Sequence, residues 1–180
     1  MEASRAALGG HRSRAHVAVL GGTFDHLHAG HRALLTAAFE RADEVKIGLT
    51  TDRFARAEEK PVPRRVQSYA TRRRRLRAFL RQQFPSRSWT VVPLTDRWGG
   101  SVGPGVDLLV LSEETARAAR PINAERRHRG LPPVRVHVVR QVPAEDGKPI
   151  ASRRIRAGEI DSEGHLLPRT GTRRRRSSKP

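Results

Sequence analysis

Five short apolar runs, rich in Val, Ile and Leu, recur along the chain and are separated by segments with helical spacing. Runs of this length and composition are typical of strands buried on both faces of a parallel sheet, with crossover helices between them. The pattern predicts the α/β class, as a Rossmann-like, doubly wound sheet of about five parallel strands. The runs occupy residues 16–20, 45–50, 90–94, 107–112 and 134–139.

Helical periodicity is clearest after the first run, where Leu34, Leu35, Ala38 and Phe39 recur at the spacing of one helical face. This spacing predicts a helix over residues 29–41. The segment after the fourth run is also helical in composition but contains Pro121. We expect a kink or two helical pieces there, because proline lacks an N–H and interrupts a helix.

Two charged segments lie between the second and third runs. Residues 51–68 are charged and contain prolines, which predicts a long loop that borders the ligand crevice and is either a functional lid or disordered. In residues 69–84 the apolar positions fall on one helical face, so most of the arginines of the run 72–75 are expected in solvent.

The length of 180 residues suits one domain, which we place at residues 15–168, after a flexible segment 1–14 and before a basic, disordered tail 169–180. No apolar run approaches the roughly 20 residues of a membrane span, and the N-terminus lacks a secretory pattern. We therefore expect a soluble, cytoplasmic protein. The chain has no cysteine, which excludes disulfides, thiolate catalysis and Cys-based zinc sites.

The formal net charge is +18, and clustered cations can bind the phosphates of nucleic acid. Like-sign runs more often mark a solvated face or a tail, so nucleic-acid binding through the tail is not expected as the main function. A basic RNA-associated protein nevertheless stays open as an alternative of another class.

Candidate chemistry gathers in "GGTFDHLHAGH", residues 21–31, at the expected carboxyl end of the first strand. Gly21 and Gly22 let a ligand approach the backbone, and Gly30 lies in a first helical turn, where free N–H groups favour an anion. His28 and His31 are three residues apart, so their rings can project to one side of that turn. Neither a P-loop nor a GxGxxG fingerprint occurs in the chain.

A zinc site made by His26, His28 and His31 is the competing interpretation. No HExxH pattern is present, and an H-x-H sequence in a tight turn directs successive rings apart. Histidines that only cap a turn are the third alternative.

The stretch "GGTFDHLHAGH" resembles the GTFD…HxGH signature of the nucleotidyltransferase superfamily, and "GKPIASRRIRAGEID", residues 147–161, resembles its second signature, ISSTxIR. Segments between them are similar to the archaeal and eukaryotic type of phosphopantetheine adenylyltransferase. The resemblance covers roughly residues 16–161 in order.

This resemblance implies an enzyme that transfers AMP from ATP to 4'-phosphopantetheine, with Mg²⁺ bound mainly through the ATP phosphates. The implied catalytic residues are Thr23, His28, His31 and Lys60, with Lys46 as the alternative lysine. The implied nucleotide-binding residues are Gly21, Gly22, Phe24, Ser112, Glu113, Glu114, Thr115, Ser152, Arg153 and Arg156. A cytidylyltransferase or another adenylyltransferase is the enzymatic alternative, and the oligomeric state stays open.

The second signature departs from the family pattern, because Ala151, Ser152 and Arg153 stand where Ser-Ser-Thr is usual. A guanidinium can pair bidentately with phosphate oxygens, so Arg153 can replace a lost hydroxyl contact. The alternative is that Arg153 faces solvent from the start of the last helix. Reduced activity or an altered nucleotide preference is the further consequence left open.

Overall fold

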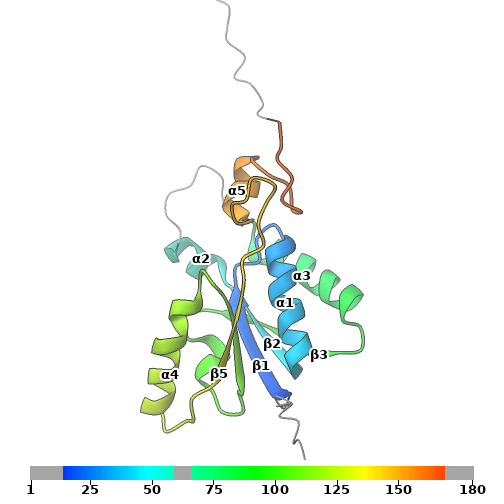
Figure 1. The fold of residues 1–180 in the computed structure, drawn as a ribbon. Helices are drawn as coiled ribbons and strands as arrows, with labels where there is room; N and C mark the ends of the chain where they lie inside the picture. Colours follow the sequence, from blue (N-terminus) through cyan, green and yellow to red (C-terminus); the bar gives the residue numbers. More distant parts are fainter. Residues whose placement is uncertain (1–13, 59–65, 169–180) are drawn as a thin grey trace, which may run out of the picture.

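The computed structural model describes residues 14–58 and 66–168. Its centre is one sheet of five parallel strands in the order β3-β2-β1-β4-β5 (Figure 1). The strands are β1 (Ala15–Gly22), β2 (Ala42–Thr50), β3 (Ser88–Leu94), β4 (Leu108–Ser112) and β5 (Arg135–Val139). Each of the five apolar runs forms one of these strands, so the predicted α/β class and strand number are confirmed.

The helices connect these strands and cover the sheet. They are α1 (Ala29–Arg41), α2 (Asp52–Glu58), α3 (Tyr69–Gln83), α4 (Ala119–His128) and α5 (Ser152–Ala157), with two 3-10 turns, η1 (Gly99–Val102) and η2 (Ala116–Ala118). Helix α1 has the predicted bounds. The expectation of a loop over residues 51–68 is wrong for its first part, because α2 begins at the second residue of that segment.

The two predicted helical pieces around Pro121 are found, but the break comes before the proline. Turn η2 ends at Ala118, and Pro121 lies in the first turn of α4. Proline is tolerated there because the first-turn N–H groups have no partner inside the helix.

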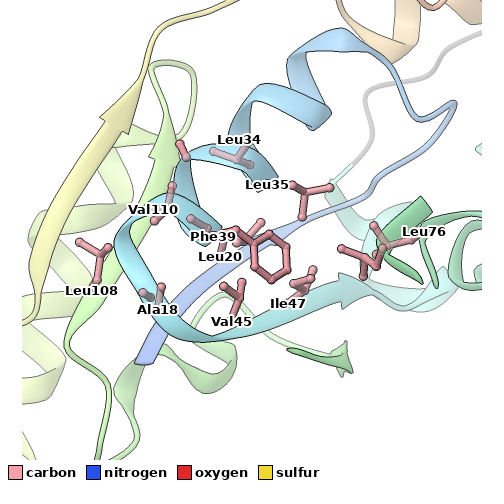
Figure 2. Packing of buried hydrophobic residues seen from close by; sticks show 14 of the residues in the cluster. Ala18, Leu20, Leu34, Leu35, Phe39, Val45, Ile47, Leu76, Leu108 and Val110 are labelled. Atoms are coloured by element: carbon pink, nitrogen blue, oxygen red, sulfur yellow. The ribbon is translucent and has the colours of Figure 1, made fainter. Parts of the chain in front are cut away.

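The sheet has a core on each face. On one face, α1 and α3 pack over β1, β2 and β4; Figure 2 shows Leu35 and Phe39 of α1, Leu20 of β1, Ile47 of β2 and Leu76 of α3 meeting there. On the other face, α4 and η1 cover alternate residues of β1 and β4, in a cluster of Val19, Val102, Val106, Leu109, Leu111, Ile122 and Val134. This alternation places α3 and α4 on opposite sides of the sheet (Figure 1).

Helix α5 lies beyond the carboxyl end of β1, above the loop that leads into α1 (Figure 1). Ligand crevices of doubly wound sheets form at this edge. Among the described residues no helix is long and apolar enough to cross a membrane.

The arginine run of α3 behaves largely as predicted. Arg73, Arg74 and Arg75 are exposed, whereas Arg72 is fully buried, which corrects the expectation for this one residue. Its burial follows from hydrogen bonds to three other segments, which no periodicity reveals.

Candidate active site

The loop between β1 and α1 makes a tight turn that begins at the two glycines. Phe24 and His26 have positive φ angles of 48° and 46°, which non-glycine residues rarely adopt. The Phe24 side chain is buried in the core, and a Cβ on Gly22 would lie 3.3 Å from its ring. Gly22 therefore gives the ring room to fold back beneath the loop.

His28 and His31 bring their rings together at the first turn of α1. The ring centroids are 3.8 Å apart with 29° between the planes, and the Phe24 ring lies 5.1 Å from that of His31. A Cβ on Gly30 would lie 3.1 Å from Cε1 of His28, so the glycine leaves space for the imidazole. The prediction that both rings project to one side of the turn is confirmed.

Both histidines are uncharged at neutral pH in this setting. Burial, aided by the positive charge of Arg32, lowers the pKa of His28 to about 4. Burial also lowers the pKa of His31 well below its usual value, with smaller contributions from His28 and Arg32. Among the described residues no group hydrogen-bonds the buried Nδ1 atom of either ring.

Asp25 joins the first motif to the second. Its carboxylate is fully buried, accepts a hydrogen bond from the Gln67 N–H at 3.1 Å, and forms an ion pair of 2.6 Å with Nη1 of Arg156. The Ser152 hydroxyl donates to the Asp25 carbonyl oxygen at 2.6 Å. These contacts hold α5 against the loop, although the joined residues are more than a hundred positions apart in the sequence.

No function was predicted for Asp25 from the sequence, although it lies inside the motif of residues 21–31. The available signal was the single acidic residue of the segment 21–31, directly after the apolar Phe24. The roles that the resemblance implies for Ser152 and Arg156 toward phosphate stay predictions, since both residues here contact Asp25.

The segment after β4 forms the neighbouring wall of the site. The Thr115 hydroxyl accepts from the Ser112 N–H at 3.1 Å and lies 3.0 Å from the Ser112 hydroxyl, closing a turn at the strand end. Glu113 accepts from the Gln141 N–H at 2.9 Å. Glu114 extends toward α5, where its carboxylate lies 3.8 Å from Arg153.

Arg153 lies at the rim of this wall. Its side chain is 62% exposed, and its pairing with Glu114 is long, so the solvent-facing alternative describes its position here. The structure thus brings the two motif segments and residues 112–115 to one edge of the sheet; the topology predicted this place for the first motif, and the resemblance implied it for the other two segments.

Of the two predicted lysines, only Lys46 lies among the described residues, and it does not join this group. Lys60 lies outside the described residues. Lys46 is in the middle of β2, paired with Val19 of β1 and 3.9 Å from Glu44, rather than at the carboxyl end of its strand.

No group of three or more His, Asp or Glu side chains among residues 14–58 and 66–168 could hold a metal ion. His26 lies 4.0 Å from Asp25, and the other two histidines stack on each other rather than converge on one point.

A separate open groove runs along α4, away from both motifs, and is lined by Ala119, Arg120, Pro121, Asn123, Ala124 and Arg127.

Two neutral imidazoles lie at the start of α1, and a serine and an arginine of α5 contact Asp25 in the loop that precedes this helix. The family described as cytidylyltransferase-like matches residues 19–158, which include all these groups. The chain therefore belongs to the cytidylyltransferase-like family.

The curated relatives show which group within the cytidylyltransferase-like family this chain is similar to. The chain is 40% identical over 162 residues to a phosphopantetheine adenylyltransferase of Methanothermobacter thermautotrophicus, covering 89% of this chain and 95% of the relative. It is 42% identical over 150 residues to the protein of that name from Methanopyrus kandleri, covering 83% of this chain and 93% of the relative. At this identity and coverage the chain groups with the phosphopantetheine adenylyltransferases.

Solved structures include a similar chain as well. A protein of unknown function from Archaeoglobus fulgidus superposes with a TM-score of 0.59 at 30% identity, covering 68% of this chain and 97% of that one.

Proposed function

We propose that this chain transfers AMP from ATP to 4'-phosphopantetheine and releases pyrophosphate, which forms dephospho-coenzyme A. In this reaction an oxygen of the acceptor's phosphate monoester bonds to the α-phosphorus of ATP, and the bond to the pyrophosphate oxygen breaks. The observation that carries the proposal is the stacked pair His28 and His31 at the start of α1, in a loop whose Asp25 binds Ser152 and Arg156 of α5.

No protein nucleophile is needed, so the residues act by positioning and by meeting developing charge. The imidazoles of His28 and His31 are directional donors fixed by their stacking, and His28 is also buried. Burial keeps them neutral, and the negative charge of an approaching triphosphate would raise their pKa because it favours the protonated ring. The site then gains positive charge as the anion binds.

The first turn of α1 supplies a second feature suited to phosphate. The Ala29 N–H already donates to the Ser162 carbonyl at 3.0 Å, whereas the following N–H groups of Gly30 and His31 lack an intrahelical acceptor. Helix starts of this kind favour anions through these groups and the helix dipole. Thr23, at the end of the glycine segment, would help to orient the attacking phosphate.

Magnesium is expected to enter with ATP, held by its phosphates and water. The described residues offer no carboxylate set for the ion, and the carboxylate of Asp25 is already bonded to Arg156 and Gln67. The protein side therefore does not fit a dedicated metal site, and no step assigned to these residues depends on one. A magnesium requirement, the oligomeric state and the cytoplasmic location stay predictions.

The experiment is a matrix of nucleotides and acceptors with purified full-length protein. We expect pyrophosphate release with ATP and 4'-phosphopantetheine, and none with pantetheine, which lacks the attacking phosphate. Preferential use of CTP, or of another phosphorylated acceptor, would replace this proposal by the cytidylyltransferase or another adenylyltransferase activity. Salt-sensitive RNA retention without turnover would favour the basic RNA-associated protein instead.

A further inference from the structure

Arg72 is the largest fully buried side chain next to the candidate site. It belongs to the first turn of α3 and is 0% exposed, although the three arginines that follow it face solvent. An arginine is rarely buried without partners, because removing its charge from water costs several kcal/mol. Its surroundings must therefore satisfy most of its five N–H donors.

The guanidinium of Arg72 connects three segments at the carboxyl edge of the sheet. Nη1 donates at 2.8 Å to the carbonyls of Thr23, directly after β1, and of Thr50, the last residue of β2. Nε donates to the Gln67 carbonyl at 2.8 Å, and Nη2 pairs with Asp52 at 2.9 Å. One side chain thus holds the loop after β1, the start of α2 and the approach to α3.

Two of these bonds lead directly to the site. Thr23 precedes Phe24, whose φ of 48° is unfavourable, so the Thr23 carbonyl needs an external partner to keep its direction. Gln67, held through its carbonyl, directs its own N–H to Asp25, which binds Arg156. A displacement of the Arg72 side chain would therefore change the positions of residues in both motifs.

We propose that Arg72 is a positioning residue for the candidate active site. It fixes the loop of residues 21–28 through Thr23 and the Asp25–Arg156 pair through Gln67, without contacting substrate itself. The kinetic part of this proposal rests on the proposed function, whereas the structural part concerns the loop alone.

Arg72→Lys is the informative substitution. Lysine keeps the positive charge but has one compact donor group instead of a planar fork, so it cannot reach the Thr23, Thr50, Gln67 and Asp52 acceptors together. The charge on α3 stays constant, and any change in rate follows from geometry.

Arg126 is a matched control on the opposite face of the sheet. It is 1% exposed and donates to four carbonyls, those of Ser101, Gly103, Val106 and Pro132, at 2.8 to 3.2 Å. Arg126→Lys therefore removes a comparable set of bonds from a buried arginine. Its acceptors belong to loops that contain neither motif.

Both variants should melt at a lower temperature than the wild type, but only Arg72→Lys should lose turnover. We expect kcat to fall about 10²-fold, the cost typical of misplacing a reacting geometry by about 1 Å, with a smaller change in KM for ATP. Arg126→Lys should keep the wild-type kcat. Equal losses of kcat in the two variants, or an unchanged kcat in Arg72→Lys, would overturn the proposal.

Hydrogen exchange supplies a readout that does not depend on the substrate. Arg72→Lys should speed amide exchange in residues 21–28, and Arg126→Lys should not; unchanged exchange in the loop would also overturn the proposal. If the wild type makes no dephospho-coenzyme A, the proposed function fails while this comparison still decides the role of Arg72. If Arg72→Lys fails to fold, Asp52→Asn is the second variant, because it removes the charged partner of Arg72. It should speed amide exchange in the same residues to a smaller extent. Unchanged exchange in Asp52→Asn would count against the proposal.

Discussion

Acidification should destabilise this protein through His28 at a pH where most surface groups have little effect. The pKa of His28 is lowered from 6.5 to about 4 in the folded chain by burial and by Arg32, whereas the unfolded chain restores the ordinary value. Between these values the unfolded state binds the proton and the folded state does not. Stability that is fully present above pH 6.5 is therefore lost as the pH falls toward 4.

The size of the loss follows from the interval between the two values. Each pH unit within the window costs about 1.4 kcal/mol, so a change from pH 7.5 to pH 5 removes about 2 kcal/mol through His28 alone. For a domain of this size the corresponding decrease in Tm is about 4 to 8 °C. His31, whose pKa is also lowered by burial, adds to the loss in the same direction.

The assay is urea unfolding at a series of pH values for the wild type, His28→Gln and His128→Gln. Glutamine does not titrate, so His28→Gln should show a shallower loss of unfolding free energy between pH 7.5 and pH 5. His128 is exposed on α4, and its replacement controls for the removal of any histidine. Parallel pH curves for the wild type and His28→Gln would refute the assigned pKa.

Three further predictions concern the reaction. His31→Ala should lower kcat by about 10²-fold to 10³-fold with little effect on ATP affinity, since a donor that meets developing charge acts in the transition state. An unchanged kcat in steady-state kinetics would remove His31 from the catalytic residues. Gly30→Ala should raise helix propensity yet lower kcat, because the new Cβ would lie 3.1 Å from the His28 ring; wild-type activity would show that the ring position is not critical. Arg153→Ala should change KM for ATP by less than about fivefold, because an exposed pair with Glu114 contributes at most about 1 kcal/mol. A larger rise in KM would show that Arg153 contacts the triphosphate.

The fold could be predicted because its signals are local and repeated. Each strand is an apolar run, and the bounds of α1 follow from the spacing of residues such as Leu35 and Phe39 that face the sheet. The position of the site also followed from topology, since parallel strands place their carboxyl ends at one edge. The second motif was matched to the first by resemblance, and the Asp25–Arg156 pair supplies the physical contact.

The contacts that hold the site together could not be predicted from these patterns. Periodicity shows which side of α3 faces the core, but the burial of Arg72 depends on carbonyl groups from Thr23, Thr50 and Gln67, which only the folded chain brings together. The same holds for α2, whose charged sequence lacks an apolar face long enough to distinguish a short helix from a loop. Lys60 lies outside the described residues, so the lysine assignment stays a prediction.

The most direct test of the central claim is a crystal structure of the full chain with ATP and pantetheine, the acceptor without its attacking phosphate. The account predicts the triphosphate between the first turn of α1 and α5, within hydrogen-bond distance of His28 and His31. A triphosphate bound instead in the groove along α4, beside Arg120 and Arg127, would contradict the assignment of the site.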